Sequence, residues 1–575
     1  MNKLFKYFNG NKTEAILAPI FKMVEALFEL FVPLAVASVI DKGIGAGDVD
    51  AVVKNVLLMC ILAFAGLASS VTAQYFAAKA AIMFTSRVRS ALFSHIQKLS
   101  YTELDRTGSA TLITRLTSDL NQLQNGVNMT LRLFMRSPFI VFGAMVMAFS
   151  IDKNEAIIFV GMILLLSIVV FGIMVICIPL YEKIQQHLDS VLLLTKDNLS
   201  GVRVIRAFCN EQSELDEFND KNDFLTSIQN FTGRISSLMN PLTLLIVNFA
   251  VIILIYTGAV KVNNGILTTG QVVALYNYLS QILVELIKLA NLILSIIKAV
   301  ACGDRVEAIL EIKSSLTYGS KEVNTAASNY ILELNNVSVR YNKGANPAIS
   351  NIDLKVKRGQ TIGIIGGTGS GKTTLVNAIS RFYDVENGEV LLNGVNIKNY
   401  PKEQLRSFFG IVPQKATLFK GSIRDNLLWR DPHASDKDLL NAAKNAQALE
   451  FITQKKGGLD YILEQGGKNL SGGQRQRLTI ARALVGDPQI IILDDSSSAL
   501  DFATDAALRK SLRENCGDRT IFIVSQRASS IQFADKIIVL DDGRAVGIGT
   551  HDRLLKNCEI YKEIYYSQFP KEAAV

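Results

Sequence analysis

The sequence is poor in charged residues and in cysteine, and each shortage excludes a class of protein. Charged residues make up only 19% of the 575 residues, whereas hydrophobic residues make up 49% and the mean hydropathy is +0.26. The six cysteines are widely scattered without C-x-x-C spacing, so neither a metal centre nor a disulfide framework is indicated. The net charge of +8 is spread along the chain without a basic stripe, which argues against a nucleic-acid partner.

Proline and glycine are also scarce in part of the N-terminal half. Residues 51–99 contain no proline and a single glycine, Gly66. A continuous helix over this stretch would be ~70 Å long, against ~30 Å of bilayer hydrocarbon. We therefore expect helices that project beyond the membrane into the cytoplasm. Two amphipathic segments, residues 101–119 and roughly 218–234, are suited to contact a cytoplasmic domain.

Long apolar stretches lie almost wholly before residue 310. Each is near the ~20 residues that a helix needs to cross a bilayer. The basic N-terminus is not followed by a small-residue cleavage site, so the first stretch is interpreted as a membrane span and not as a signal peptide. The six predicted spans lie near residues 14–40, 53–78, 133–150, 156–180, 238–260 and 272–297.

The distribution of basic residues predicts the orientation of these spans. The connections near 41–50, 151–155 and 261–270 hold only Lys42, Lys153 and Lys261, whereas the remaining segments are rich in Lys and Arg. By the positive-inside rule, both termini are cytoplasmic. The protein is therefore expected in the cytoplasmic membrane, surrounded by lipid.

Three ionisable residues of the first span share one helix face. Lys22, Glu25 and Glu29 stand at positions i, i+3 and i+7. Ionisable groups in lipid are expensive and usually face a cavity or a partner. They either line a cavity for a cationic or amphipathic cargo, or they are neutralised by a Lys22 to Glu25 pair or by Lys288 and Glu285 of the last span.

A phosphate-binding motif begins the second half of the chain. Residues 366–373, GGTGSGKT, fit the pattern G-x-x-x-x-G-K-[ST] and lie between a predicted strand, in NIDLKVKRGQTIGIIG, and a predicted helix, in TTLVNAISRFY. Backbone N–H groups of residues 367–373 would cradle the phosphates of ATP, with Lys372 on the β and γ groups and the Thr373 hydroxyl on Mg²⁺. The domain opens earlier with ILELNNVSVRY, which alternates like an edge strand.

Three further residues are candidates for the same site. Asp494 ends the apolar strand QIIILDD and is predicted to face Mg²⁺, the alternative being a helix N-cap. Gln414 in GIVPQ is able to meet Mg²⁺ or the attacking water, although alone it would be an ordinary loop glutamine. Tyr341 is able to stack on the base, although alone it is a packed strand residue.

The order Tyr341, GGTGSGKT, Gln414, LSGGQ, IIILDD, SALD resembles that of ATP-binding cassette (ABC) proteins, for which LSGGQ is highly specific. The membrane half is similar to ABC exporters as well, in LDRTGSATLITRLTSD and LSGVRVIRAF. The resemblance covers nearly the whole chain. It implies an all-α six-helix transmembrane domain with long cytoplasmic extensions at 1–310, a linker at 311–330, and an α/β P-loop ATP-binding cassette domain at 331–575.

In this family two half-transporters sandwich ATP between the phosphate loop of one chain and the LSGGQ of the other. The nucleotide-binding residues carried over by the resemblance are Tyr341, Gly366, Gly367, Thr368, Gly369, Ser370, Gly371, Lys372, Thr373, Thr374, Leu470, Ser471, Gly472, Gly473 and Gln474. Those directed at Mg²⁺ are Thr373, Gln414 and Asp494.

The chain departs from the family pattern at two catalytic positions. Asp495 stands where the family has the glutamate that polarises the attacking water, and Gln526 stands where it has a histidine that contacts the γ-phosphate. Loss of a well-placed general base typically lowers a rate by ~10² to 10⁴. The pattern resembles the impaired-site subunit of heterodimeric bacterial multidrug exporters, which predicts a second, non-identical half-transporter as partner. The alternative is a slow homodimer in which both replacements are tolerated.

The expected function is therefore ATP-driven export of a hydrophobic or amphipathic compound. Lipids and peptides are alternative cargoes, and a non-pumping ATP-gated channel or regulator is an alternative function. The intact LSGGQ argues against the last alternative, because a regulator has little need to complete a competent site elsewhere.

Overall fold

The computed structural model describes residues 2–323, 328–341, 344, 346–496, 499–515 and 517–569. The chain forms two compact units. The first contains residues 1–97 and 108–312, and the second contains residues 98–107 and 313–575.

The first unit is built from helices, several of them longer than a bilayer is thick. Helix α2 has 48 residues and α7 has 55, which correspond to about 72 and 82 Å. The scarcity of proline and glycine in α2 predicted such a helix. In chain order the elements are η1 (Asn2–Phe8), α1 (Lys12–Ser38), η2 (Val39–Ile44), α2 (Val49–Ile96), α4 (Ser109–Thr114), η3 (Arg115–Asp119), α5 (Leu120–Leu133), α6 (Arg136–Ile151), α7 (Lys153–Ala207), α8 (Glu211–Ser237), α9 (Met239–Asn263) and α10 (Thr269–Glu311).

Within the described residues, five helical segments are long and apolar enough to cross a membrane. They are Lys12–Ile44, Val49–Ile96, Ser109–Ile151, Lys153–Ala207 and Glu211–Asn263. These segments contain the first five predicted spans. The sixth predicted span, residues 272–297, lies inside α10, which is a continuous helix but is not among the five.

Small residues line the helix contacts of the first unit. Ala18 of α1 and Ala77 of α2 are fully buried, as are Ala144 of α6 and Ala274 of α10. A Cβ added to Gly126 of α5 would lie 2.1 Å from the Cβ of Ala299. Such residues let helix backbones approach closely, which is how helices associate where lipid removes the hydrophobic driving force.

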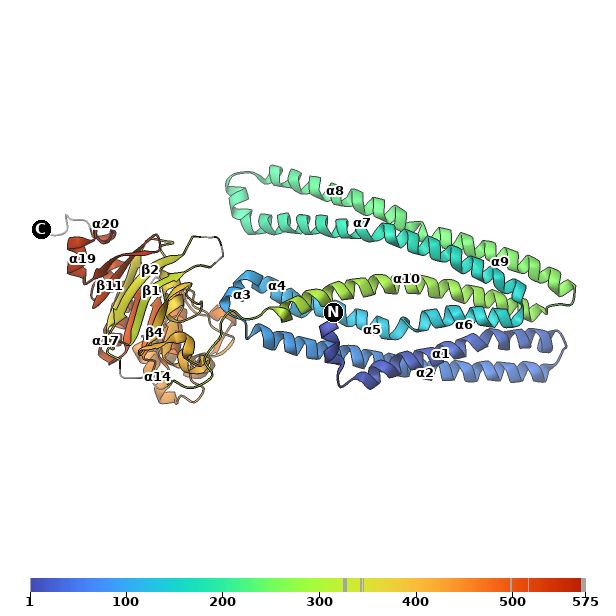
Figure 1. The fold of residues 1–575 in the computed structure, drawn as a ribbon, viewed down its shortest axis with the longest axis horizontal. Coiled ribbons are helices and arrows are strands. Elements are labelled where there is room, and N and C mark those ends of the chain that lie inside the picture. Colours follow the sequence, from blue (N-terminus) through green and yellow to red (C-terminus); the bar gives the residue numbers. More distant parts are fainter. Residues whose placement is uncertain are drawn as a thin grey trace. The chain divides into compact units, whose positions relative to one another are not determined.

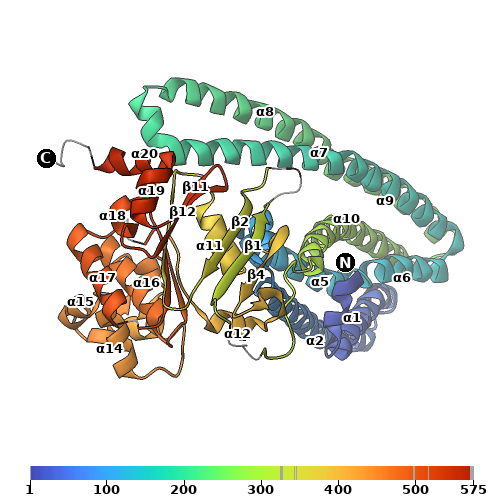
Figure 2. The same cartoon turned by 60° about the vertical axis from the view of Figure 1, so that its left-hand side comes forward.

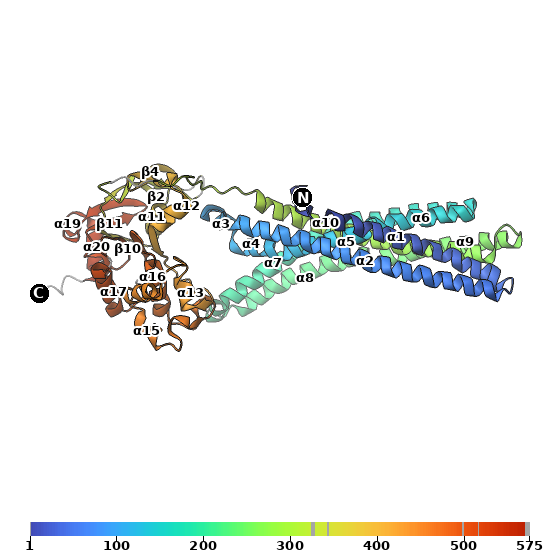
Figure 3. The same ribbon diagram turned by 90° about the horizontal axis from the view of Figure 1, so that it is seen from below.

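The α7–α8 hairpin runs apart from the bundle of α1, α2, α5 and α10 at the end that carries residues 208–210 (Figures 1 and 3). Helix α8 packs mainly against α7 and, where it continues into α9, against that helix. Phe208, at the tip, is 79% exposed. Because α8 contacts mainly its two neighbours in sequence, much of its surface is available to another protein chain.

The second unit contains a six-stranded sheet, a four-stranded antiparallel sheet and surrounding helices (Figure 2). The larger sheet has the order β12-β11-β3-β10-β9-β6 and is parallel except for β12. Its strands are β3 (Thr361–Gly366), β6 (Phe409–Val412), β9 (Ile490–Asp494), β10 (Thr520–Val524), β11 (Lys536–Asp541) and β12 (Arg544–Gly549). The smaller sheet, β2-β1-β4-β5, comprises β1 (Leu332–Val339), β2 (Ile349–Val356), β4 (Asn387–Leu392) and β5 (Val395–Asn396).

Helices and short elements cover these sheets. They are α3 (Tyr101–Thr107), α11 (Lys372–Ile379), η4 (Ile397–Asn399), α12 (Lys402–Ser407), β7 (Gly421–Ser422), α13 (Ile423–Leu427), α14 (Asp436–Asn445), α15 (Leu449–Gln454), η5 (Gly458–Asp460), β8 (Ile462–Leu463), η6 (Gln465–Gly467), α16 (Gly472–Leu484), α17 (Phe502–Asn515), α18 (Ala528–Ile531), α19 (His551–Asn557) and α20 (Glu559–Gln568). Strand β9 separates two cores, because Ile490 and Ile492 pack into one cluster and Ile491 and Leu493 into the other. A strand buried on both faces reads as a continuous apolar run, which is what QIIILDD shows.

The expectation that residues 331–341 form an edge strand was wrong. Strand β1 lies between β2 and β4 and pairs with both. Its alternation arises because one face of an antiparallel sheet is buried, and this holds for central strands as well as edge strands.

Part of the expected linker is packed onto the second unit. Arg381, which is 1% exposed, donates to the carbonyl oxygen of Thr317 at 2.5 Å and stacks on Tyr318 at 4.7 Å. The same guanidinium donates to the carbonyl oxygen of Ile397 at 3.3 Å and to Asp384 at 2.9 Å. One buried cation therefore fixes the chain as it enters the second unit.

We expect Arg381→Met to destabilise the second unit by about 3 kcal/mol, because it leaves buried acceptors without their donor. Trp429 is the single tryptophan of the chain and lies in this unit, so its fluorescence in urea titrations of the detergent-solubilised full chain reports the unit's unfolding. The matched surface change Lys510→Met should shift the free energy by less than about 0.5 kcal/mol. Equal effects of the two substitutions would contradict an anchoring role for Arg381.

Candidate functional site

The loop between β3 and α11 forms the floor of the candidate nucleotide site. Gly371 has φ +94°, and a Cβ there would lie 2.6 Å from the Cγ2 of Ile349. A Cβ on Gly366 would lie 2.1 Å from the carbonyl oxygen of Leu540. Both positions therefore require glycine, and the loop can bend so that its N–H groups and the N-terminus of α11 face a common centre, as phosphate binding needs.

Lys372 is held at the centre of this loop. Its ammonium donates to the carbonyl oxygens of Gly366 at 2.9 Å and Gly367 at 2.6 Å. Burial lowers the pKa of Lys372, while the nearby carboxylates of Asp495 and Asp494 act in the opposite direction. The lysine is thus placed where phosphate oxygens would meet it, opposite two acidic groups.

Oxygen donors suited to Mg²⁺ gather beside the loop. The hydroxyl of Thr373 lies 3.5 Å from Oδ1 of Asp494. The side chain of Gln414 lines the same pocket as Thr373 and Asp494. The Ser370 hydroxyl is buried and has no hydrogen-bond partner among the described residues. A hydroxyl, a carboxylate and an amide beside a phosphate loop fit Mg²⁺, which takes a few protein oxygens and completes its shell with phosphate and water.

This donor set does not form a metal site by protein side chains alone. Across the described residues, no group of three or more His, Cys, Asp or Glu side chains is placed to hold a metal ion. The residues therefore fit a metal that arrives with a nucleotide. Such an ion, when bound, would neutralise charge on the β and γ phosphates.

Both acidic residues at the end of β9 have raised pKa values. For Asp494, burial is the main cause, and the adjacent Asp495 adds to it, whereas the Thr373 hydroxyl and Lys372 oppose it. For Asp495, burial again raises the pKa, against Lys372 and a hydrogen bond from Gln414. Asp495 has φ +45°, a left-handed conformation that aspartate adopts more readily than most residues.

A hollow of ≈ 260 Å³ brings most of the predicted phosphate and catalytic residues together. It is lined by Ala348, Thr368, Gly369, Gly371, Lys372, Thr373, Thr374, Gln414, Asp494, Asp495, Val524 and Gln526. The two residues that depart from the family pattern, Asp495 and Gln526, are both part of this lining. Tyr341 is adjacent, because its hydroxyl donates to the Thr374 hydroxyl at 3.0 Å.

The LSGGQ segment lies apart from this hollow. Ser471 caps the N-terminus of α16 by accepting from the Gln474 N–H, and the Gln474 side chain in return accepts from the Ser471 N–H. Leu470 is 5% exposed and anchors the turn in the core. None of residues 470–474 lines the hollow. The phosphate loop and LSGGQ therefore lie at separate places in the second unit.

Two contacts at the site were not foreseen from the sequence. The Tyr383 hydroxyl donates to Asp105 of α3, and its ring meets Tyr341 edge-on at 4.9 Å. Tyr101 of α3 also packs on Phe382 at 4.8 Å. The segment 101–119 was expected to contact a cytoplasmic domain, and its first part, α3, packs with the second unit. No motif marked Tyr383, because a lone tyrosine after a helix has no characteristic spacing.

The second unforeseen contact holds the loop that carries Gln526. Gln568 of the last helix, α20, donates to the carbonyl oxygen of Gln526 at 2.8 Å and accepts from the N–H of Ala528 at 2.8 Å. One amide thus bridges the backbone on both sides of residue 527. The contact joins residues that are 40 or more positions apart, so local patterns carry no signal for it.

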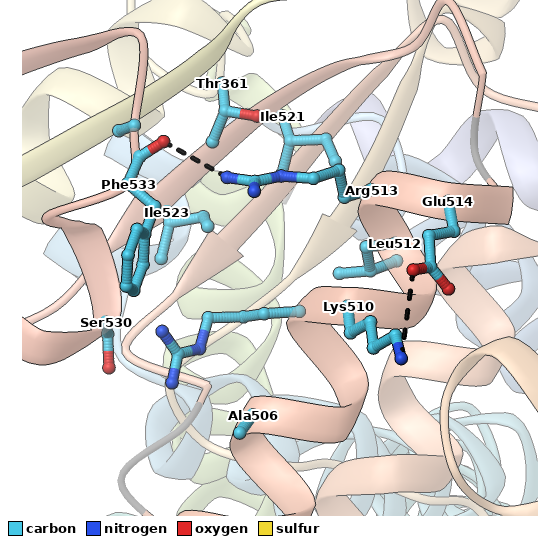
Figure 4. A pocket seen from close by; sticks show the side chains of 12 residues that line it. Thr361, Ala506, Lys510, Leu512, Arg513, Glu514, Ile521, Ile523, Ser530 and Phe533 are labelled. Carbon is cyan, nitrogen blue, oxygen red and sulfur yellow. Dashed lines mark hydrogen bonds and ion pairs between the residues drawn. The ribbon is translucent and has the colours of Figure 1, made fainter.

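A further hollow of the second unit, ≈ 310 Å³, lies between α17 and β10 (Figure 4). Arg513 donates to the carbonyl oxygen of Phe533 at 3.3 Å, and Lys510 lies 4.0 Å from Glu514. None of the predicted site residues lines it.

In the first unit, the ionisable face of α1 contacts Arg136, a residue that was not predicted from the sequence to take part. Lys22 pairs with Glu25 at 2.5 Å, as one of the alternatives proposed. Glu29 accepts from Arg136 of α6 at 2.7 Å, and the same guanidinium donates to Glu285 of α10 at 2.7 Å. Arg136 lies within the predicted third span, and a charged residue inside a span indicates a partner of opposite charge, so the sequence could have predicted this pairing.

Comparison with known proteins agrees with this arrangement. The family model of the ABC transporter transmembrane region matches residues 15–286, and the ABC transporter model matches residues 349–498. An uncharacterized ABC transporter ATP-binding protein of Mycobacterium tuberculosis is 34% identical over 95% of this chain and 94% of its own. The chain belongs to the ABC transporter family. It is a multi-pass membrane protein that fuses a transmembrane region to an ATP-binding domain.

Two other similarities extend this result. An ATP-dependent lipid A-core flippase of Desulfotalea psychrophila is 32% identical over 84% of each chain. The solved structure of a bacterial Atm1-family ABC exporter with ATP bound has a TM-score of 0.80 at 23% identity, over 97% of this chain and 98% of that one. The whole chain thus has the fold of such an exporter, as the sequence predicted.

We expect Asp494→Asn to stabilise the nucleotide-free chain. A carboxyl whose folded-state pKa is raised destabilises the folded state as pH rises from its unfolded value, ~3.9. The gain in the free energy of unfolding should therefore be present at pH 7 and disappear as the pH falls below that unfolded-state value. Trp429 fluorescence in urea titrations measures it, with the exposed Glu563→Gln as control. A gain that did not grow with pH would contradict the raised pKa.

Tyr341→Ala should weaken ATP binding roughly tenfold, since stacking a base on an aromatic ring contributes ~1–3 kcal/mol. Tyr341→Phe keeps the ring but removes the hydrogen bond to Thr374, so its affinity should stay within about twofold. Calorimetric titration of the full chain with ATP and Mg²⁺ measures both. Equal losses would show that the hydroxyl, and not the ring, matters.

Proposed function

We propose that this chain is the impaired-site half of a heterodimeric ABC exporter, which uses ATP to move hydrophobic or amphipathic compounds out of the cytoplasm. Its own hollow holds ATP with Mg²⁺, and both termini are cytoplasmic. Its LSGGQ completes the hydrolytic site of a non-identical partner chain.

The observation that carries this proposal is the composition of the nucleotide hollow. Asp495 and Gln526 line it together with Lys372, so both departures from the family pattern fall in the same site. The LSGGQ segment lies elsewhere and follows the family pattern. If two copies of this chain paired, each of the two nucleotide sites between them would have the shorter Asp495 in place of glutamate and Gln526 in place of histidine. A partner with glutamate and histidine would give one competent site.

The chemistry of the hollow agrees with slow turnover. Asp495 is shorter than glutamate by one methylene, about 1.5 Å of reach along an extended chain. Burial also raises the pKa of Asp495, which acts in the same direction by favouring the protonated form that cannot accept a proton from water. Gln526 can donate a hydrogen bond to a phosphate oxygen but cannot carry the positive charge of an imidazolium.

The form of the first unit supports assembly with a second chain. The α7–α8 hairpin extends from the bundle with an exposed phenylalanine, Phe208, at its tip. Leu199, Val204 and Leu215, which are near the tip in sequence, are also exposed, and a surface that gathers apolar side chains is typical of an interaction site. A second half-transporter is the partner that such a hairpin would contact.

Lipid export is a second candidate function, favoured by the relative named as a lipid A-core flippase. Transport into inside-out vesicles with a panel of amphipaths and lipids distinguishes the two. Nucleotide-dependent conductance without net transport would instead support a channel.

Two substitutions in this chain test the pairing. In the complex with a half-transporter that has glutamate and histidine, Asp495→Asn should change ATPase activity by less than about twofold, because this site already turns over slowly. Ser471→Arg should lower it by ~10² or more, because it blocks the partner's site. A homodimer predicts large losses from both.

The same assay on this chain purified alone sets the baseline. We expect little turnover, and the double change Asp495→Glu with Gln526→His should raise it by ~10² or more. Vigorous ATPase activity of the unaltered chain without a partner would exclude the heterodimer.

A further inference from the structure

A second hollow, ≈ 530 Å³, lies in the first unit between α1, α6 and α10. Its volume is within the range of small-molecule sites, ~300–1,000 Å³. It is lined by Glu29, Val32, Pro33 and Val36 of α1, by Arg136 and Ile140 of α6, and by Asn277, Ser280, Gln281, Val284, Glu285 and Lys288 of α10. Apolar and charged side chains therefore share one wall.

Four of the charged side chains at this hollow or next to it are paired and buried. Lys22 with Glu25 and Arg136 with Glu285 have side chains that are 10% exposed or less. Ser137 also donates to Glu285, at 2.8 Å. These four charges neutralise each other, which is the condition under which ionised groups persist in a membrane interior.

Two charges of opposite sign remain open to the hollow. Glu29 is 43% exposed and Lys288 is 44% exposed at their side chains. Each is also paired with one buried charge, Glu29 with Arg136 at 2.7 Å and Lys288 with Glu285 at 2.9 Å. A carboxylate and an ammonium with one charged partner each retain hydrogen-bonding capacity for a ligand. The wall thus presents one carboxylate from α1 and one ammonium from α10.

Uncharged groups complete the lining. Asn277, Ser280 and Gln281 follow one face of α10 toward Lys288, and the amide oxygen of Gln281 has no hydrogen-bond donor among the described residues. Val32, Pro33 and Val36 of α1 provide apolar surface beside Glu29.

We propose that this hollow is a binding site for zwitterionic amphipaths, with the cationic group of the ligand at Glu29, its anionic group at Lys288 and its alkyl chain against the valines and Pro33 of α1. The six ionisable groups of the cluster, Lys22, Arg136, Lys288, Glu25, Glu29 and Glu285, sum to zero charge. A zwitterion keeps that sum at zero, whereas a singly charged ligand adds an unbalanced charge in a region of low dielectric constant.

This assignment rests on the proposed transport function and specifies its cargo class. Binding alone tests it, without ATP or a partner. The full chain is placed in nanodiscs of phosphatidylglycerol, whose headgroup is not zwitterionic. Binding of four radiolabelled probes with the same dodecyl chain is measured against empty nanodiscs: dodecylphosphocholine, dodecyltrimethylammonium, dodecyl phosphate and dodecyl maltoside.

The unaltered chain should bind dodecylphosphocholine roughly tenfold more tightly than dodecyltrimethylammonium or dodecyl phosphate, which both carry a net charge. Glu29→Gln should weaken the zwitterion and strengthen dodecyl phosphate, whereas Lys288→Gln should weaken the zwitterion and strengthen dodecyltrimethylammonium. Lys298→Gln, on the exposed part of α10 outside the hollow, should leave all four affinities unchanged.

Three results overturn the proposal. They are no preference for the zwitterion in the unaltered chain, equal effects of Glu29→Gln and Lys288→Gln on all probes, or an equal loss with Lys298→Gln. The first needs no variant, so misfolding of a variant cannot mask it.

A last measurement identifies the source of the ligand. Displacement of dodecylphosphocholine by phosphatidylcholine mixed into the nanodisc supports a membrane lipid as ligand, and the absence of displacement supports a free amphipath. If the chain binds the zwitterion selectively but the assembled transporter moves no amphipath, the proposed function is wrong and this binding site remains. If the transporter moves amphipaths but this chain shows no preference for the zwitterion, the binding site is wrong and the proposed function remains.

Discussion

Close packing of backbone around the loop between β3 and α11 is the constraint on which the nucleotide site depends. Gly366 lies against the carbonyl oxygen of Leu540, and Gly371 lies against Ile349, with no room for a side chain at either. These contacts turn the N-terminus of α11 toward the carboxyl ends of the parallel strands β9 and β10. In parallel sheets ligands bind at those ends, so Asp494, Asp495 and Gln526 come to face the same loop.

Both units place ionised groups where water is scarce, and they treat them differently. In the nucleotide hollow the carboxyls of Asp494 and Asp495 have raised pKa values, so the empty site is unfavourable and a bound cation relieves it. In the membrane unit Arg136 is surrounded by Glu25, Glu29 and Glu285, and the charges are balanced inside the protein. In the second arrangement the charges already balance, which suits a neutral, dipolar ligand.

Particular elements show how far the sequence could predict this structure. The phosphate loop was predictable because its residues are consecutive and their spacing fits a known motif, although the contacts of Gly366 and Gly371 with Leu540 and Ile349 were not. The position of β1 was not, because alternation reports a buried face and says nothing of whether both edges are paired. Arg136 and Gln568 were also missed, since their partners Glu29, Glu285 and Gln526 lie far away in the chain.

By itself the sequence determined the family, the two-part organisation and the candidate phosphate-binding residues, because these are encoded by residue types at short, fixed spacing. Only the tertiary structure decided which charges meet. Whether Glu29 is neutralised or left open depends on how α6 and α10 pack beside α1, and the separation of LSGGQ from the phosphate loop of the same chain depends on where α16 packs in the second unit. Both are set by contacts between distant segments, whose energies no local pattern contains.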